Sequence, residues 1–283
     1  MGSERKTAGY ARADAVPAMV AGRHPIEVGG AGGDDVGTLS DGYLTPLLIL
    51  LPGLDGTGIL FHRFVEAIGT RVDTRIIAYP ADELLGYAEL EALIRNALPT
   101  DRPYAVLGES FSGPIAIRLA ADPPAGLLGL VLGVTFAKNP YPLFGWAGPW
   151  ASSVPLTAVP GWVRASFMWG TSATERARDE SERATAMVGQ AVLQHRIAAV
   201  LRVDETDSLA RIRIPTLVLQ GSDDHVVPRS ATEHIMRTLP TAERVEIRGP
   251  HMLLQIRAAE CAAAVVGFMQ GLQRNGKAPP LIR

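Results

Sequence analysis

The sequence predicts an α/β fold, in which a mostly parallel sheet carries helices on both of its faces. The run LLILL at 47–51 is made wholly of apolar residues, which is typical of a strand that is covered on both sides, and similar short runs recur along the 283 residues. Between most of these runs the apolar residues stand three or four positions apart, as they do along one face of a helix. Strands that alternate with helices are typical of a parallel sheet, because parallel neighbours need a crossover connection.

Each expected strand is short and ends at a glycine, a proline or a polar turn. We expect strands at 47–51, 74–78, 104–107, 127–132, 216–220 and 244–247. The helical spacing predicts helices at 59–68, 84–98, 112–121, 230–239 and 253–272. A further short edge strand is expected at 24–28, ahead of a glycine-rich stretch.

Two parts of the chain depart from this alternation. Residues 1–42 are rich in small and polar residues, which bury little apolar area for each residue ordered, so we expect a flexible N-terminal segment. Residues 136–210 separate two expected strands by far more than one helix requires. We therefore expect an α/β core made of 43–135 and 211–283, with 136–210 inserted as a helical cap, or lid.

The expected cap contains all four tryptophans of the chain, Trp146, Trp150, Trp162 and Trp169. Aromatic side chains are common in the core of a small helical subdomain and also in a lid that faces a substrate. The two interpretations are compatible and both stay open. In the second interpretation, the four tryptophans line an apolar pocket for the substrate.

Composition and charge exclude several classes of protein. The chain has 27 Lys and Arg against 29 Asp and Glu, a net charge of −2, so we expect no nucleic-acid partner. Its one cysteine, Cys261, can form neither an intramolecular disulfide nor a cysteine zinc site, and we expect no metal. The first twenty residues lack an apolar stretch, and polar residues interrupt 252–272, so we expect no secretion signal, no membrane span and a cytoplasmic location.

The segment 104–114, YAVLGESFSGP, carries the strongest indication of chemistry. It predicts a strand, a sharp turn with Ser110 at its apex, and a helix with Pro114 in the first turn. A serine in such a turn can point into a cleft only if small neighbours let the backbone segments approach closely. The segment resembles the nucleophile elbow of the α/β-hydrolase family in a G-x-S-x-S-G form, with Ser112 where the family usually has glycine. A serine that only caps the helix is the alternative interpretation.

A base and an orienting acid must accompany a nucleophilic serine, and both are present downstream in the family's order. The segment 216–228, TLVLQGSDDHVVP, resembles the family's acid loop, and its register selects Asp224, with Asp223 as the alternative. His251 follows a strand and precedes the last helix, which is the position of the family's histidine. His225, next to the acid, is its nearest rival.

The loop after the first strong strand, 51–58 (LPGLDGTG), occupies the family's position for the oxyanion hole. The resemblance implies that the backbone amides of Leu54 and Phe111 stabilise the negative charge that develops on an attacked carbonyl oxygen. Loops of this L-P-G-x-D-G-T-G form occur in esterase, thioesterase and plant phytyl ester synthase-like sequences. We expect Asp55 to point away from the developing charge.

The resemblance implies an α/β-hydrolase fold and a serine esterase. In that hypothesis Ser110 attacks a carboxylic ester, His251 is the base and Asp224 orients it, with no cofactor and with a small, apolar ester as substrate. One alternative is an acyltransferase or thioesterase that uses the same triad. Another is a scaffold that binds a ligand without catalysis, because a fold does not determine a function.

Overall fold

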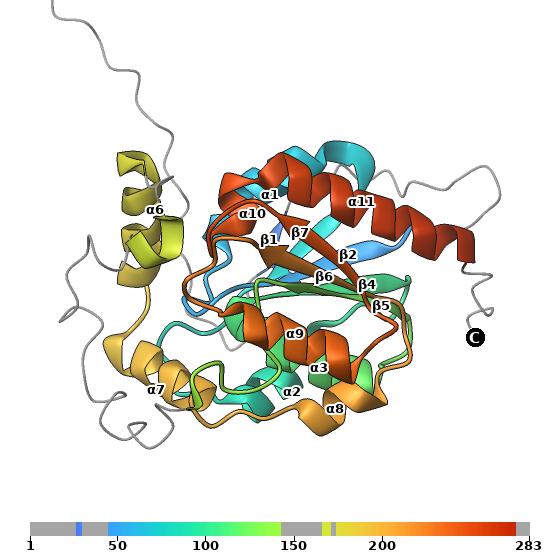
Figure 1. The fold of residues 1–283 in the computed structure, drawn as a ribbon, viewed down its shortest axis with the longest axis horizontal. Coiled ribbons are helices and arrows are strands. Elements are labelled where there is room, and N and C mark those ends of the chain that lie inside the picture. Colours follow the sequence, from blue (N-terminus) through green and yellow to red (C-terminus); the bar gives the residue numbers. More distant parts are fainter. Residues whose placement is uncertain (1–26, 30–44, 143–165, 171–173, 276–283) are drawn as a thin grey trace, which may run out of the picture.

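The computed structural model describes residues 27–29, 45–142, 166–170 and 174–275, which are drawn in colour in Figure 1. Its described residues form one seven-stranded sheet in the order β1-β3-β2-β4-β5-β6-β7. The strands are β1 (Glu27–Gly29), β2 (Leu47–Leu51), β3 (Thr74–Ile77), β4 (Tyr104–Glu109), β5 (Leu127–Gly133), β6 (Thr216–Gly221) and β7 (Glu243–Ile247). β1 pairs antiparallel with β3 and the other neighbouring pairs are parallel. The predicted α/β class and mostly parallel sheet are confirmed.

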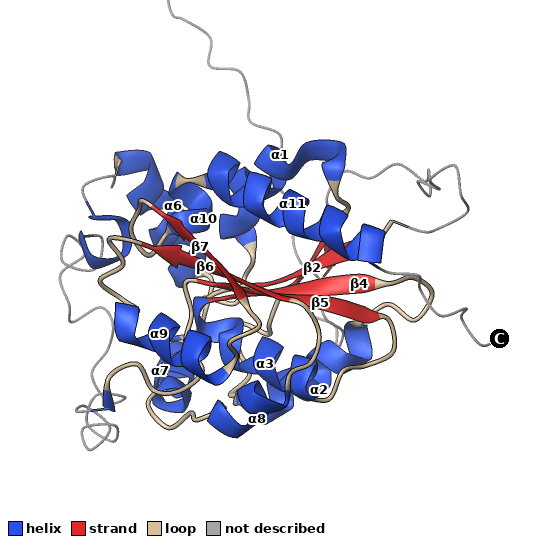
Figure 2. Cartoon of the chain, turned by 45° about the vertical axis from the view of Figure 1, so that its right-hand side comes forward, coloured by secondary structure: helices blue, strands red, loops and turns tan. Residues whose placement is uncertain are grey.

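Helices cover both faces of this sheet (Figure 2). On one face lie α1 (His62–Ile68), α10 (Leu253–Ile256) and α11 (Ala258–Asn275). On the other lie α2 (Tyr87–Ala97), α3 (Gly113–Ala121), α8 (Thr206–Arg211) and α9 (Arg229–Thr238). Residues of β2 alternate between the two apolar cores, because successive side chains of a strand point to opposite faces: Leu47, Ile49 and Leu51 belong to one core and Leu48 and Leu50 to the other.

The expected strands and helices of the core are present, with small shifts at their ends. The helix expected at 84–98 begins at Tyr87, because the Glu89 side chain accepts a hydrogen bond from the Gly86 amide and fixes the start there. The helix expected at 253–272 is two helices, α10 and α11, which are separated at Arg257 by a non-helical backbone conformation (φ −112°, ψ 38°). The expected edge strand is β1, although it lies slightly later than 24–28, and the rest of residues 1–42 lies outside the described residues.

The connection between β5 and β6 carries α6 (Glu175–Ala186) and α7 (Gln190–Val200) before α8. Figure 1 places α6 and α7 beyond one end of the sheet, whereas α8 packs against α3 in a helix layer. The two ends of the connection meet at an isolated bridge between Lys138 and Asp204. Among the helices in the described residues, none has the length and apolar character that crossing a bilayer requires.

Candidate active site

Ser110 lies in the turn between β4 and α3, at the carboxyl end of a central strand. Its φ of 49° is in the left-handed region, which costs a residue other than glycine about 1–3 kcal/mol. Two glycines permit the turn. A Cβ added to Gly108 would lie 2.7 Å from the Cβ of Ala116, and one added to Gly113 would lie 1.9 Å from Oγ1 of Thr135. Helix α3 therefore lies close both to β4 and to the segment that follows β5, which leaves no room for larger side chains at these two positions.

Ser112, which stands where the elbow motif usually has glycine, is completely buried. Its hydroxyl donates a hydrogen bond to the carbonyl oxygen of Pro52 in the loop after β2, and its oxygen lies 2.5 Å from the hydroxyl oxygen of Tyr79. Since the Ser112 proton goes to Pro52, Tyr79 donates to Ser112, and burial raises the pKa of Tyr79 and keeps its proton in place. The extra hydroxyl thus ties the elbow to the neighbouring loop.

The structure brings Ser110, His251 and Asp224 together from three separate parts of the chain. Oγ of Ser110 lies 2.9 Å from Nε2 of His251, and Nδ1 of the same ring lies 2.8 Å from Oδ2 of Asp224. The other carboxylate oxygen of Asp224 accepts hydrogen bonds of 2.8 Å from the amides of Val226 and Val227. His251 is 3% exposed, so its ring orientation is determined by these partners. This arrangement can take a proton from a serine hydroxyl and return it.

The alternatives that sequence reasoning left open lie elsewhere. Asp223 is exposed and accepts a hydrogen bond from Ser222 at 3.1 Å. His225 is also exposed. The histidine that contacts Ser110 is His251, and the carboxylate that contacts His251 is that of Asp224.

The loop of residues 52–58 lies against the elbow and holds one of the two predicted oxyanion donors. Within the described part of the chain, the amides of Leu54 and Phe111 donate to no protein acceptor, which leaves both able to bind a ligand oxygen. Oδ1 of Asp55 accepts a hydrogen bond of 2.9 Å from the amide of Thr57, so this carboxylate is engaged inside the loop. Gly56 has a φ of 71°, which the tight bend requires.

A protein-family model described as serine aminopeptidase, S33, matches residues 87–251, more than half of the chain. This chain is a member of that α/β-hydrolase family. The match begins at α2 and ends at His251, so it includes Ser110 and Asp224 and omits the loop of residues 52–58.

Individual relatives of the hydrolase are distant. It is 24% identical over 230 residues to a protein of Klebsiella pneumoniae (strain 342) named "Putative carbamate hydrolase RutD", covering 71% of this chain and 82% of that one. It is 25% identical over 253 residues to polyketide synthase ThaQ of Burkholderia thailandensis, which covers 82% of this chain but only 12% of ThaQ. The crystal structure of the enol-lactonase from Burkholderia xenovorans LB400 is similar with a TM-score of 0.68 at 16% identity, covering 87% of this chain and 96% of that one. At this identity the structural likeness shows the fold.

Glu109, the residue before Ser110, is a buried carboxyl group in this hydrolase, 6% exposed. Nε2 of Gln255, which lies far away in the sequence, donates a hydrogen bond of 2.9 Å to this carboxyl group. Burial raises the pKa of Glu109 to about 7; the hydrogen bond from Gln255 and the nearby His251 oppose this shift, while Asp55 adds to it. The carboxyl group therefore loses its proton near neutral pH.

Replacing Glu109 with glutamine is expected to remove a pH-dependent loss of stability. A carboxyl group whose pKa is higher in the folded chain stabilises the fold below about pH 4.5, and this contribution disappears as the pH rises through about 7. The difference in unfolding free energy between Glu109→Gln and the wild type should therefore grow by ~3 kcal/mol across this window. Urea unfolding at pH 5 and pH 8 measures it, with Glu243→Gln, a change at an exposed residue, as the control. A difference that stays constant with pH would contradict the shifted titration.

Of the four tryptophans, Trp169 lies in the described residues and Trp146, Trp150 and Trp162 lie outside them. The Trp169 side chain is 1% exposed, packs with Ala177 of α6 and with Met252, and its indole nitrogen donates to the hydroxyl of Ser181 at 3.1 Å. It therefore joins α6 to the residue that follows His251.

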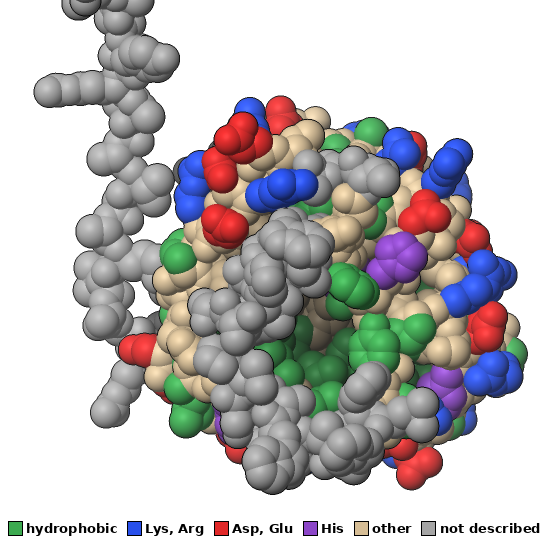
Figure 3. Space-filling view, turned by 60° about the vertical axis from the view of Figure 1, so that its left-hand side comes forward, with side chains coloured by type: hydrophobic (Ala, Val, Ile, Leu, Met, Phe, Trp, Pro, Cys, Tyr) green, Lys and Arg blue, Asp and Glu red, His purple; other side chains and the backbone are tan. Residues whose placement is uncertain are grey.

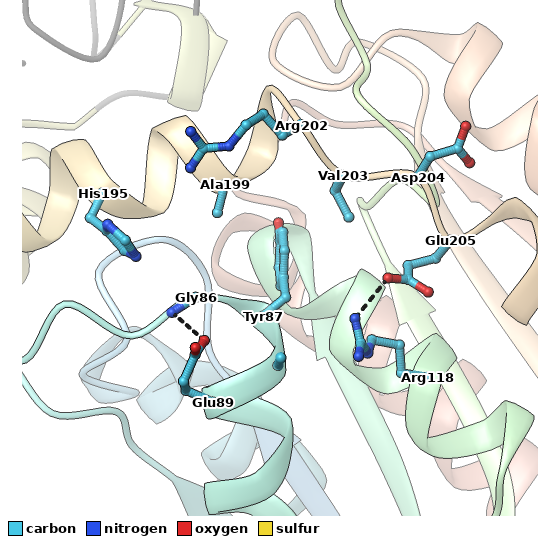
Figure 4. Close-up of a pocket in the computed structure, with 11 residues that line it drawn as sticks. Gly86, Tyr87, Glu89, Arg118, His195, Ala199, Arg202, Val203, Asp204 and Glu205 are labelled. Carbon is cyan, nitrogen blue, oxygen red and sulfur yellow. Dashed lines mark hydrogen bonds and ion pairs between the residues drawn. The ribbon is translucent and has the colours of Figure 1, made fainter. Parts of the chain in front are cut away.

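A groove of about 390 Å³ lies between the start of α2 and the end of α7 (Figure 4). Its lining includes Tyr87, His195 and Arg118, the last held by Glu205 at 3.1 Å. The Tyr87 ring stacks on Phe111 with 4.9 Å between centroids, so Tyr87 separates the groove from the elbow. Among the described residues, no serine or cysteine lines this groove, and a covalent step is expected at Ser110 instead.

Proposed function

We propose that this α/β-hydrolase cleaves carboxylic esters through an acyl-enzyme on Ser110. The observation that carries the proposal is the pair of hydrogen bonds from Ser110 to His251 and from His251 to Asp224, 2.9 and 2.8 Å long. A serine hydroxyl is a weak nucleophile on its own, and a histidine held by a buried carboxylate is the arrangement that activates it.

In the proposed reaction, Oγ of Ser110 forms a bond to the acyl carbon while Nε2 of His251 takes the hydroxyl proton. Asp224 stabilises the imidazolium that results. The carbonyl oxygen, now negatively charged, accepts hydrogen bonds from the amides of Leu54 and Phe111, each worth about 3–4 kcal/mol of barrier lowering. The bond to the leaving alcohol then breaks as His251 returns the proton to it. Water repeats the cycle on the acyl-enzyme and releases the acid.

The surface on the side of α6 and α7 favours an apolar substrate. Figure 3 shows a hollow on the side of the molecule that carries α6 and α7, and hydrophobic side chains form most of its visible floor. Leu54 itself packs against the apolar cluster of Val188, Val192 and Leu193, the last two of which belong to α7. Burial of an apolar acyl or alcohol group in such a hollow provides binding energy in proportion to its area.

The test uses the wild-type protein, a series of p-nitrophenyl esters and a fluorophosphonate probe. We expect turnover of the esters and one covalent adduct, which peptide mass spectrometry locates on Ser110. Ester turnover that continues after the probe has reacted completely, or an adduct on another residue, would overturn the proposal. A carbamate ester belongs in the same series, because RutD is named a carbamate hydrolase.

Acyl transfer or thioester cleavage is the second candidate, and the loop sequence LPGLDGTG at 51–58 favours it through its resemblance to thioesterase and phytyl ester synthase-like sequences. The two reactions share the acyl-enzyme and differ in the acceptor. With an added long-chain alcohol, transfer predicts a new ester in preference to free acid, whereas hydrolysis predicts free acid. A scaffold that only binds a ligand predicts no adduct on Ser110.

We also propose that tryptophans of the 136–210 segment face the substrate. Trp146→Ala, Trp150→Ala and Trp162→Ala are expected to lower kcat/KM about tenfold or more for long acyl chains and less for acetate esters, because lost apolar contacts matter most for long chains. Trp169→Ala is expected instead to destabilise the fold by about 3–5 kcal/mol, since its side chain is packed beside Met252. An unchanged chain-length profile in Trp146→Ala, Trp150→Ala and Trp162→Ala would remove the substrate role.

A further inference from the structure

Arg196, on α7, is a buried arginine whose contacts all converge on the loop that holds the predicted oxyanion donor. The residue is 1% exposed. Its Nη1 donates to the carbonyl oxygens of Leu54 and Asp55 at 3.0 and 2.8 Å, and its Nη2 donates to the carbonyl oxygen of Pro80 at 2.9 Å. The guanidinium also lies over the ring of Tyr79, 5.6 Å from its centroid.

These bonds complete a series in which five successive carbonyl groups of the loop are held. Pro52 accepts from the hydroxyl of Ser112, and Gly53 accepts from the amide of Gly56 at 3.0 Å. Arg196 holds the next two carbonyls, and that of Gly56 accepts from the amide of Tyr79 at 2.8 Å. Each bond fixes one peptide plane. The Leu54 amide shares its peptide plane with the carbonyl of Gly53, which accepts from the Gly56 amide, and the Gly56 amide shares its plane with the Asp55 carbonyl that Arg196 holds. Through this relay, the direction of the Leu54 amide depends on a guanidinium that comes from a different part of the chain.

The packing around Arg196 gives the contact little freedom. Val192, Leu193 and Arg196 lie on one face of α7, and the first two belong to the apolar cluster against which Leu54 packs. A Cβ added to Gly56 would lie 2.5 Å from Nη1 of Arg196, so the loop backbone is in direct contact with the guanidinium. Helix α7 thus reaches the loop both through apolar contacts and through Arg196.

The side chain is also an expensive one to bury. Its hydrogen bonds in the described residues go to neutral carbonyls, and its buried Nε has no partner there. Burial lowers the pKa of Arg196, which shows that the charged form is disfavoured at this position, whereas Asp55 favours it. A buried charge without a hydrogen-bonded carboxylate is rarely the most stable solution for packing a helix. Such costs are common where activity requires a particular geometry.

We propose that Arg196 is a positioning residue for ester cleavage, which aligns the oxyanion donor of the loop after β2 and makes α7 part of the active site. The inference rests on the proposed function of Ser110. In this role Arg196 touches no reacting atom. It holds the Leu54 and Asp55 carbonyls so that the Leu54 amide faces the negative oxygen in the transition state, where a displacement of about 1 Å costs about 10²-fold in rate.

The test compares Arg196→Lys and Arg196→Met with Arg202→Met, an equivalent change at an exposed arginine just after α7. We expect kcat for a p-nitrophenyl ester to fall about 10²-fold in Arg196→Met and about tenfold in Arg196→Lys, which keeps the charge but not the forked donor. KM should stay within threefold. The pH dependence of kcat/KM should not move, because His251 and Asp224 keep their contacts.

An alkyl boronic acid provides the readout that separates positioning from general damage to the fold. Its tetrahedral adduct with serine places an oxygen where the transition-state oxygen lies, so its Ki should rise in parallel with the loss of kcat. The inference is wrong if both variants fold and keep kcat and Ki within threefold of the wild type. It is also wrong if neither variant folds, since Arg196 would then be purely structural. If Arg196→Met alone fails to fold, Arg196→Lys decides. A wild-type protein without ester turnover or probe labelling would instead overturn the proposed function itself.

Discussion

Ser110→Ala is expected to lower kcat for ester hydrolysis by about 10⁶-fold and to abolish labelling by a fluorophosphonate. Without the hydroxyl, no acyl-enzyme forms and the His251 base has nothing to deprotonate. The fold should survive, because the one hydrogen bond of the Ser110 side chain in the described structure goes to His251. Alanine also keeps the same backbone limits at φ 49° as serine, so the strain of the turn is unchanged.

The measurement is kcat by p-nitrophenol release, together with intact-protein mass after exposure to the probe. Ser222→Ala is a matched control, since this serine is exposed and donates to the neighbouring Asp223. We expect it to keep wild-type kcat and to be labelled once. Without the nucleophile, an oxyanion hole alone still accelerates the reaction ~10³-fold over water, which is far below the wild-type rate. If Ser110→Ala kept more than about a thousandth of the wild-type kcat, the nucleophile would lie elsewhere.

Much of this site follows from an elementary property of parallel sheets. The carboxyl ends of parallel strands lie on the same edge, so residues that follow β4, β6 and β7 are neighbours although they are far apart in the chain. The sequence places Ser110, Asp224 and His251 after those three strands. Apolar runs make β4 and β6 recognisable, whereas β7 (ERVEI) mixes polar and apolar residues. The resemblance of the segment from Gly221 to Pro228 to the family's acid loop also favours Asp224 over Asp223.

The residues that the sequence did not reveal have partners on segments without a recognisable pattern. Arg196 is one of several arginines in a helical stretch, and nothing in the spacing of that stretch indicates which of them turns inward onto a loop some 140 positions earlier. Gln255 is likewise a polar residue at the start of an amphipathic region, and its contact with Glu109 depends on the exact packing of α10. Periodicity predicts which face of an element is buried, and it does not predict which polar groups meet there.

Three residues near the site each lower the stability of the fold, and all three lie at the same edge of the sheet. Ser110 has a strained backbone, Glu109 is a buried carboxyl group and Arg196 is a buried charge. Local rules of stability are usually broken where activity requires it. The two large apolar cores on either side of the sheet provide the stability that offsets these costs.

Asp224→Asn is expected to lower kcat by about 10⁴-fold through the tautomer of His251 rather than through the fold. Oδ1 of Asp224 accepts from the amides of Val226 and Val227, and those two donors will keep the oxygen of an asparagine in place. The NH₂ group must then face Nδ1 of His251. Because both cannot donate, Nδ1 becomes the acceptor and the proton moves to Nε2, which is the atom that has to take the proton of Ser110.

The matched control is Asp223→Asn, in which the same change is made at the exposed neighbour, whose carboxylate accepts a hydrogen bond from Ser222. We expect wild-type kcat from that variant and unchanged thermal stability from both. The double variant Ser110→Ala and Asp224→Asn should be no slower than Ser110→Ala alone, because the three side chains act as one unit. Additive losses would mean that Asp224 acts independently of the hydroxyl. Equal activity of the two asparagine variants would show that the 2.8 Å contact with His251 does not orient the base.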